Sequence, residues 1–148
     1  NDNLWLSVVD KGFCTPPMNS LNELEIGFNA EILCVEIANN QDKYVSISVL
    51  GKSLNEICTE MLEALKNDFG VNADLSAGEF DSARKIEVDP EEAQKFLKQF
   101  VNFSDLLTAF HKSIAFNDGI KSQINLWPHH FDNAFKWFSG RKIDEMDE

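Results

Sequence analysis

The sequence has few cysteines and few glycines, the residues on which disulfides, zinc ribbons and phosphate-binding loops depend. It contains three cysteines and no Cys-x-x-Cys pair, so neither a disulfide framework nor a zinc ribbon is suggested. Gly51-Lys52-Ser53 ends like a P-loop, but the required earlier glycine is replaced by Ser46. Neither Gly-x-Gly-x-x-Gly nor Gly-x-Ser-x-Gly occurs. The familiar nucleotide-binding and hydrolase signatures are therefore absent.

Basic residues are also scarce. The chain has thirteen Lys and Arg and twenty-five Asp and Glu, which gives a net charge of −12. The electrostatic field of this negative charge repels phosphate groups, so neither nucleic acid nor an anionic membrane surface is an expected partner. No apolar run approaches the ~18 residues of a membrane span, and no signal-peptide pattern opens the chain. Together with the apolar surroundings of the cysteines, these absences predict a cytoplasmic protein.

The chain has enough hydrophobic residues to form one hydrophobic core. The chain has 148 residues, of which 43% are hydrophobic and 11% aromatic. This length predicts a single domain. We place it at residues 1–143, followed by an acidic tail at 144–148.

The first fifty residues carry strand signals. Leu24, Ile26 and Phe28 alternate with polar residues or glycine, and 45–49 repeats this period of two. The run 32–37 is apolar at nearly every position, which is typical of a central strand. Turn residues separate the runs. The pattern predicts an antiparallel meander.

The period then changes to that of helices. Ser53 and Glu56 have capping-box spacing, and apolar residues at helical spacing continue to a stop at Gly70. Asp89-Pro90 begins a second long helix, which we expect to end at 117–119 and to break near 102–104. Residues 124–127 read as a strand, 128–133 as an irregular corner, and 134–138 as a return strand or short helix.

This order of elements predicts an α+β fold. Its antiparallel sheet combines the meander with C-terminal strands, about five or six in all, and the two long helices pack on one face. The opposite face is left free, and Trp5, Phe13 and Tyr44 are candidates to line it.

The candidate site lies in 124–140, which holds two of the three histidines and two of the three tryptophans. If 128–132 is extended, His130 and Asp132 point to one face and His129 to the other. An imidazole and a carboxylate two residues apart could begin a two-His-one-carboxylate metal site. His111, on the apolar face of the second helix, would supply the second imidazole. The identity of any metal, and of any other cofactor, is left open.

Two other interpretations need no metal. In one, His130 and Asp132 orient a small molecule in a pocket against the second helix, as general base and orienting group if the protein is an enzyme. In the other, the histidines and Asp132 only pack and cap, and the chain is a structural or protein-interaction module. The pocket interpretation adds these lining residues: His111, Trp127, His129, Phe131 and Trp137. Catalysis, substrate and oligomeric state stay open.

The run Trp127-Pro128-His129-His130-Phe131-Asp132, with 137–141 after it, resembles the bacterial domain of unknown function 5996 family. Similar stretches occur in the same order at 4–18, 53–75 and 89–93. The resemblance implies that family members have a further helix before Asn1. It also implies a glycine- and aromatic-rich hairpin after Glu148. It implies no activity, cofactor or partner.

Overall fold

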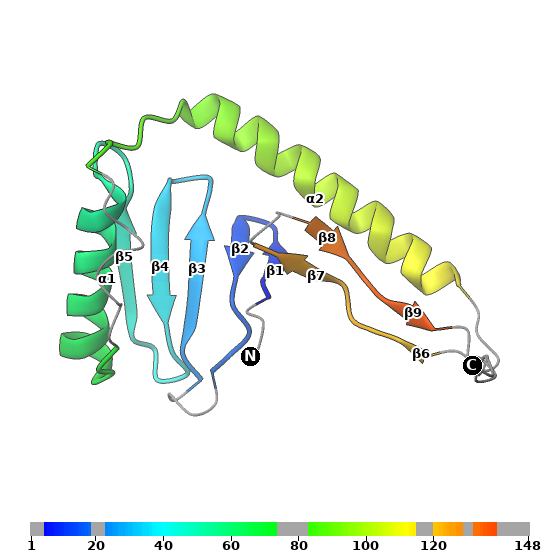
Figure 1. The fold of residues 1–148 in the computed structure, drawn as a ribbon, viewed down its shortest axis with the longest axis horizontal. Coiled ribbons are helices and arrows are strands. Elements are labelled where there is room, and N and C mark those ends of the chain that lie inside the picture. The colour runs from blue at the N-terminus through cyan, green and yellow to red at the C-terminus, as the bar shows by residue number, and fades with distance from the viewer. Residues whose placement is uncertain (1–4, 19–22, 74–82, 115–119, 129–131, 139–148) are drawn as a thin grey trace, which may run out of the picture.

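The structure is a computed structural model that describes residues 5–18, 23–73, 83–114, 120–128 and 132–138. In 120–121 and 137–138 only the backbone is described. The fold is α+β, as predicted. A five-stranded antiparallel sheet stands beside one helix, and a second, longer helix runs from the top of the sheet along a narrow C-terminal extension (Figure 1).

The sheet is a meander, with strands in the order β1-β2-β3-β4-β5 and each pair antiparallel. Its strands are β1 (Ser7–Val9), β2 (Gly12–Cys14), β3 (Glu25–Asn29), β4 (Cys34–Ala38) and β5 (Tyr44–Ser48). Phe13, Phe28, Val35 and Ile47 are successive cross-strand neighbours, so they line one face together. This is the face that the helices cover.

Helix α1 (Leu54–Phe69) begins and ends where the sequence predicts. Ser53 and Glu56 form the capping box, and Gly70 ends the helix in the left-handed conformation, with φ 69°. Ala64 and Leu65 pack on Ile37 and Ile47 of the sheet. Because Ile37 is completely buried, this contact forms the centre of the core.

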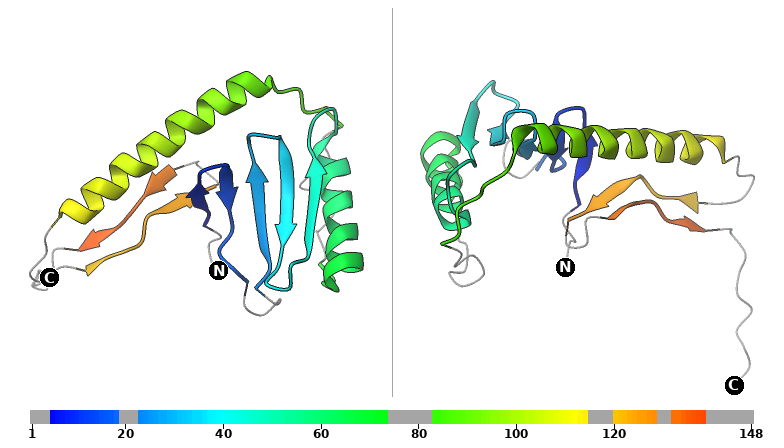
Figure 2. Two further views of the ribbon diagram at one scale, coloured as in Figure 1. Left: turned by 180° about the vertical axis from the view of Figure 1, so that it is seen from behind. Right: turned by 90° about the horizontal axis from the view of Figure 1, so that it is seen from above.

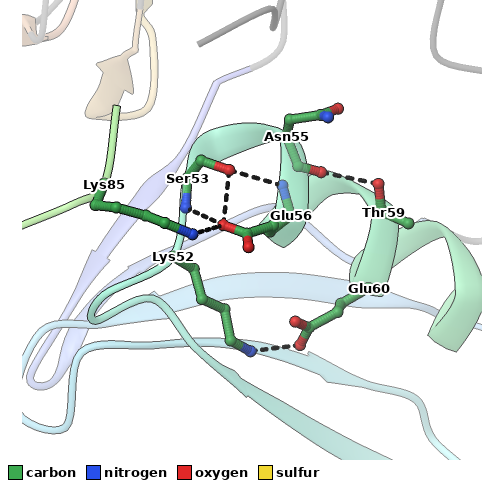
Figure 3. A network of polar contacts seen from close by, with 7 residues as sticks. All are labelled: Lys52, Ser53, Asn55, Glu56, Thr59, Glu60 and Lys85. Atoms are coloured by element: carbon green, nitrogen blue, oxygen red, sulfur yellow. Dashed lines mark hydrogen bonds and ion pairs between the residues drawn. The ribbon is translucent and has the colours of Figure 1, made fainter. Parts of the chain in front are cut away.

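A polar network ties the start of α1 to the segment before the next helix (Figure 3). The Ser53 amide donates to Glu56 Oε2 over 2.7 Å, and the Lys85 ammonium pairs with the same oxygen. Lys52 Nζ contacts Glu60 Oε2 at 2.5 Å. The ion pair with Lys85, followed by the bonds from Ser53, lowers the pKa of Glu56 from 4.5 to about 2.

Acid is expected to weaken this network. Since the pKa of Glu56 is lowered to about 2, its stabilising contribution is present above about pH 4.5 and is lost as the pH falls toward 2. Glu56→Gln removes the contribution, so its urea midpoint should lie below that of the wild type at pH 7 and approach it as the solution is acidified. Circular dichroism of urea unfolding at several pH values measures this. A gap between wild type and variant that stays constant down to pH 2 would contradict the prediction. Glu60→Gln, which removes the neighbouring ion pair with Lys52, is the control.

Helix α2 (Pro90–Ser113) is continuous for 24 residues, so the break expected near 102–104 is absent. Asp89 caps it, its carboxylate accepting from the Glu91 amide at 2.9 Å. The helix ends at Ser113, earlier than predicted, and residues 117–119 lie outside the described residues. Phe100 meets Phe13 of β2 edge to face, with ring centroids 5.4 Å apart. Neither α1 nor α2 has the length and apolar character to cross a membrane.

The C-terminal strands form a separate ribbon, which we define as residues 120–128 and 132–138. Its strands are β6 (Ile120–Lys121), β7 (Asn125–Trp127), β8 (Asp132–Ala134) and β9 (Trp137–Phe138); β6 pairs with β9 and β7 with β8. Two backbone hydrogen bonds between Leu6 and Leu126, of 2.8 and 2.9 Å, join the ribbon to the segment before β1. The sequence predicts that these strands extend the sheet; instead they leave it and follow α2 (Figure 2).

Candidate functional site

The predicted corner is a β-hairpin. Trp127, the last residue of β7, is the direct cross-strand partner of Asp132, the first residue of β8. Asp132 is exposed and Trp127 half-buried, and the Lys136 ammonium lies 5.8 Å from the centre of the Trp127 ring. His129, His130 and Phe131 lie outside the described residues. Trp137 lies in β9, where only the backbone is described.

His111 lies near the C-terminal end of α2 and contacts the ribbon. Its Nε2 is 2.9 Å from the carbonyl oxygen of Ser122, and its ring meets Phe135 edge to face at 4.7 Å. Because a carbonyl oxygen can only accept, Nε2 carries the hydrogen in this contact. That nitrogen is therefore engaged in joining the helix to the ribbon.

The cross-strand register shows which side chains lie on each face of the β7–β8 hairpin. The register pairs Asn125 with Ala134 and Trp127 with Asp132 on one face, and Leu126 with Asn133 on the other. Phe135, two residues beyond Asn133, packs against α2, so the Asn133 face is turned toward the helix. His111 and Asp132 are consequently not brought to the same side of the hairpin.

The structure describes two of the three residues predicted to hold a metal, His111 and Asp132. Among the described residues, no group of three or more His, Cys, Asp and Glu side chains could hold a metal ion. The metal site therefore stays a prediction that depends on His130.

Sequence reasoning missed Asn133. Both its side-chain atoms, Nδ2 and Oδ1, are buried and have no hydrogen-bond partner in the described part of the chain, and the same holds for Oδ1 of Asn125. Its cross-strand neighbour Leu126 has 0% of its surface exposed. A buried amide without partners is costly, and native structures contain few of them. The only sequence signal was an asparagine at a core-facing position of an alternating segment.

A cleft of about 510 Å³ lies elsewhere, under the N-terminal half of α2. Leu97 and Val101 line it together with three charged residues, Asp10, Glu31 and Lys98. Gln94 Nε2 donates to the Glu31 carbonyl across its rim at 3.4 Å. The volume suits a small molecule, but none of the residues predicted from the sequence lines this cleft.

The free face of the sheet is polar. Tyr44 projects from it and donates to Glu36 Oε1 at 2.7 Å, which raises the pKa of Tyr44. Burial, with a contribution from Glu25, raises the pKa of the Cys14 thiol, so this cysteine is a poor nucleophile. Phe13, expected on this face, is buried on the opposite one against Phe100.

Residues 2–148 match the family described as "Family of unknown function (DUF5996)". The chain belongs to this family. The match confirms the resemblance inferred from the Trp-Pro-His-His-Phe-Asp run and covers nearly all of the chain. No curated protein and no solved structure matches it. Because the function of the DUF5996 family is unknown, the match assigns no activity to this chain.

Proposed function

We propose that this DUF5996 chain binds a small molecule between the C-terminal half of α2 and the ribbon. The observation that carries the proposal is the Asn133 amide, whose donor and acceptor are both buried and unpaired in the described part of the chain. Each such atom costs roughly 1–3 kcal/mol. Folded proteins keep buried polar atoms without hydrogen-bond partners mainly at positions where function requires the polar group.

The chemistry of an amide indicates the ligand class. Nδ2 donates and Oδ1 accepts, side by side in one plane. A carboxamide or lactam offers the complementary acceptor and donor in the same geometry. The ligand we propose therefore carries a primary or secondary amide group.

Access to Asn133 requires α2 and the ribbon to separate locally. They meet through the hydrogen bond from His111 to Ser122 and through the rings of Phe110 and His111 against Phe135. A bound ligand would take over part of this contact. Trp127 and Asp132 project from the opposite face of the same hairpin, so their role would be to hold the hairpin rather than to touch the amide.

Catalysis at this site is a further proposal that depends on His130. In an enzyme, His130 would act as general base or metal ligand, and Asp132 would orient it or stabilise its charge. Loss of turnover in His130→Ala with unchanged amide binding would separate catalysis from binding.

The binding proposal is tested by ligand-observed NMR with acetamide, 2-pyrrolidone and N,N-dimethylacetamide as probes. The first two are expected to bind, and the dimethylated compound, which cannot donate, to bind at least about tenfold more weakly. Asn133→Leu should abolish the binding of all three. Asn72→Leu makes the same chemical change at an exposed position and should bind as the wild type does. If no amide binds the wild type, or if Asn133→Leu binds them unchanged, the site is not at Asn133.

A second function, protein–protein interaction, is favoured by a separate observation. Among the described side chains of α2 only Leu97 is buried, although the helix is 24 residues long and rich in phenylalanine. Phe96, Phe103, Leu106 and Phe110 are at least half exposed, and apolar side chains exposed together in this way are typical of an interaction surface.

A further inference from the structure

The cleft under the N-terminal half of α2 has no role in the function proposed above. One of its walls is a single face of the helix, because the lining residues of α2 follow helical spacing: Gln94, Leu97, Lys98, Val101 and Asn102. Leu97 is buried and Val101 half-buried, whereas the other three are exposed. The cleft is therefore apolar where it is shielded from solvent and polar around its rim.

The opposite wall is formed by two turns of the sheet. Asp10 lies between β1 and β2 and Glu31 between β3 and β4, at the end of the sheet over which α2 passes (Figure 1). The Ala30 amide donates to the Lys11 carbonyl at 2.8 Å, which ties the two turns together. The buried side chain of Asn29 accepts from the Glu31 amide at 3.1 Å and holds the second turn. Both acidic residues are thus positioned without bonds from their own carboxylates.

The charged residues of the cleft are not paired with one another. Within the described part of the chain, Asp10, Glu31 and Lys98 form no ion pair, either among themselves or with other described residues. Charges of both signs therefore border one cavity and are left available to a ligand. The carboxamides of Gln94 and Asn102 add hydrogen-bond donors and acceptors at the same rim.

We propose that this cleft binds a small zwitterion, an α-amino acid with an aliphatic side chain. Its ammonium group would pair with the carboxylates of Asp10 and Glu31, and its carboxylate with the ammonium of Lys98. Its aliphatic side chain would cover Leu97 and Val101 and leave water. The volume of about 510 Å³ lies in the range of small-molecule pockets.

The mixture of charges favours a zwitterion over a simple cation or anion. A ligand with only an ammonium group would leave Lys98 without a partner, and a ligand with only a carboxylate would meet two like charges, Asp10 and Glu31. Because the charged residues are exposed, each pair contributes little, and we expect a dissociation constant of about 0.1–1 mM. The site lies beyond the function proposed above and shares no residue with the Asn133 site.

The ligand class is tested by saturation-transfer NMR of the whole chain with three probes that share one aliphatic group: L-leucine, 3-methylbutylamine and 4-methylpentanoate. Leucine is expected to bind. Each of the other two should bind at least about fivefold more weakly, because each lacks one set of charge-assisted hydrogen bonds. A wild type that binds none of the three overturns the proposal. An amine or an acid that binds as tightly as leucine also overturns it.

Two charge-removing variants test the location. Lys98→Gln should weaken leucine binding about fivefold and leave the amine unaffected, and Glu31→Gln should weaken leucine binding and leave 4-methylpentanoate unaffected. Lys112→Gln is the matched control, because it makes the same change at an exposed position of α2 outside the cleft. Circular dichroism checks that each variant is folded. Equal effects of Lys98→Gln and Lys112→Gln would place the site elsewhere. Asn133→Leu should bind leucine as the wild type does, so failure of one proposal leaves the other intact.

Discussion

Asn133→Leu is expected to raise the free energy of unfolding by about 2 kcal/mol or more. Two buried polar atoms without partners in the described part of the chain are replaced by methyl groups of similar shape, on the face that Leu126 shares. Removing both polar atoms ends their desolvation cost, and the added methyl groups pack on apolar neighbours. Urea unfolding followed by circular dichroism measures the change.

Asn125→Leu is the matched comparison for this prediction. Only Oδ1 of Asn125 is buried and unpaired in the described part of the chain, so its gain should be smaller, about 1 kcal/mol. A loss of stability in Asn133→Leu would mean that the amide makes bonds in the folded protein. Higher stability together with lost amide binding is the signature of a residue kept for function at the expense of stability.

Gly12→Ala is expected to lower the free energy of unfolding by about 3 kcal/mol or more. A Cβ at Gly12 would lie 1.8 Å from the carbonyl oxygen of Phe28, and the backbone φ of +155° is one that other residues rarely adopt. The clash is with the backbone of the neighbouring strand β3, so no side-chain rotation relieves it. The sheet would have to shift at β2.

Gly51→Ala separates the clash from the backbone effect. Gly51 also has a positive φ, +69°, but nothing lies within 4 Å of an added Cβ. Its cost should be only the left-handed penalty of about 1–2 kcal/mol. Equal losses for the two variants, measured by thermal and urea unfolding, would contradict the proposed clash at Gly12. Since the ribbon is joined through Leu6 next to β1, Gly12→Ala should also loosen the ribbon.

Local signals account for most of the fold that could be predicted. The capping box at Ser53 and Glu56, the stop at Gly70 and the Asp89-Pro90 start are all where the sequence places them. Each depends on neighbours a few residues apart, so its physical cause is contained in a short stretch of chain. The alternation of strands β3 and β5 is equally local.

The candidate site could be predicted only in part. The segment around Trp127 and Asp132 was identified from its unusual residues, and the structure makes it a hairpin. The importance of Asn133 could not be foreseen, because whether an amide has partners depends on what packs above it. His111 joins the helix to the ribbon through Ser122, a contact that no spacing rule predicts.

By itself the sequence determined the meander, both helix starts, the α+β class and the family, because these depend on local periodicity, capping and motif order. Only the tertiary structure decided that the C-terminal strands leave the sheet, since strand partners are chosen by long-range packing. It also decided which apolar residues of α2 are buried. The helical period places Phe96 and Leu97 together on one broad face. In the structure Leu97 is buried, whereas Phe96 and Phe103 are exposed; α2 contacts β1, and its Phe100 packs on Phe13 of β2.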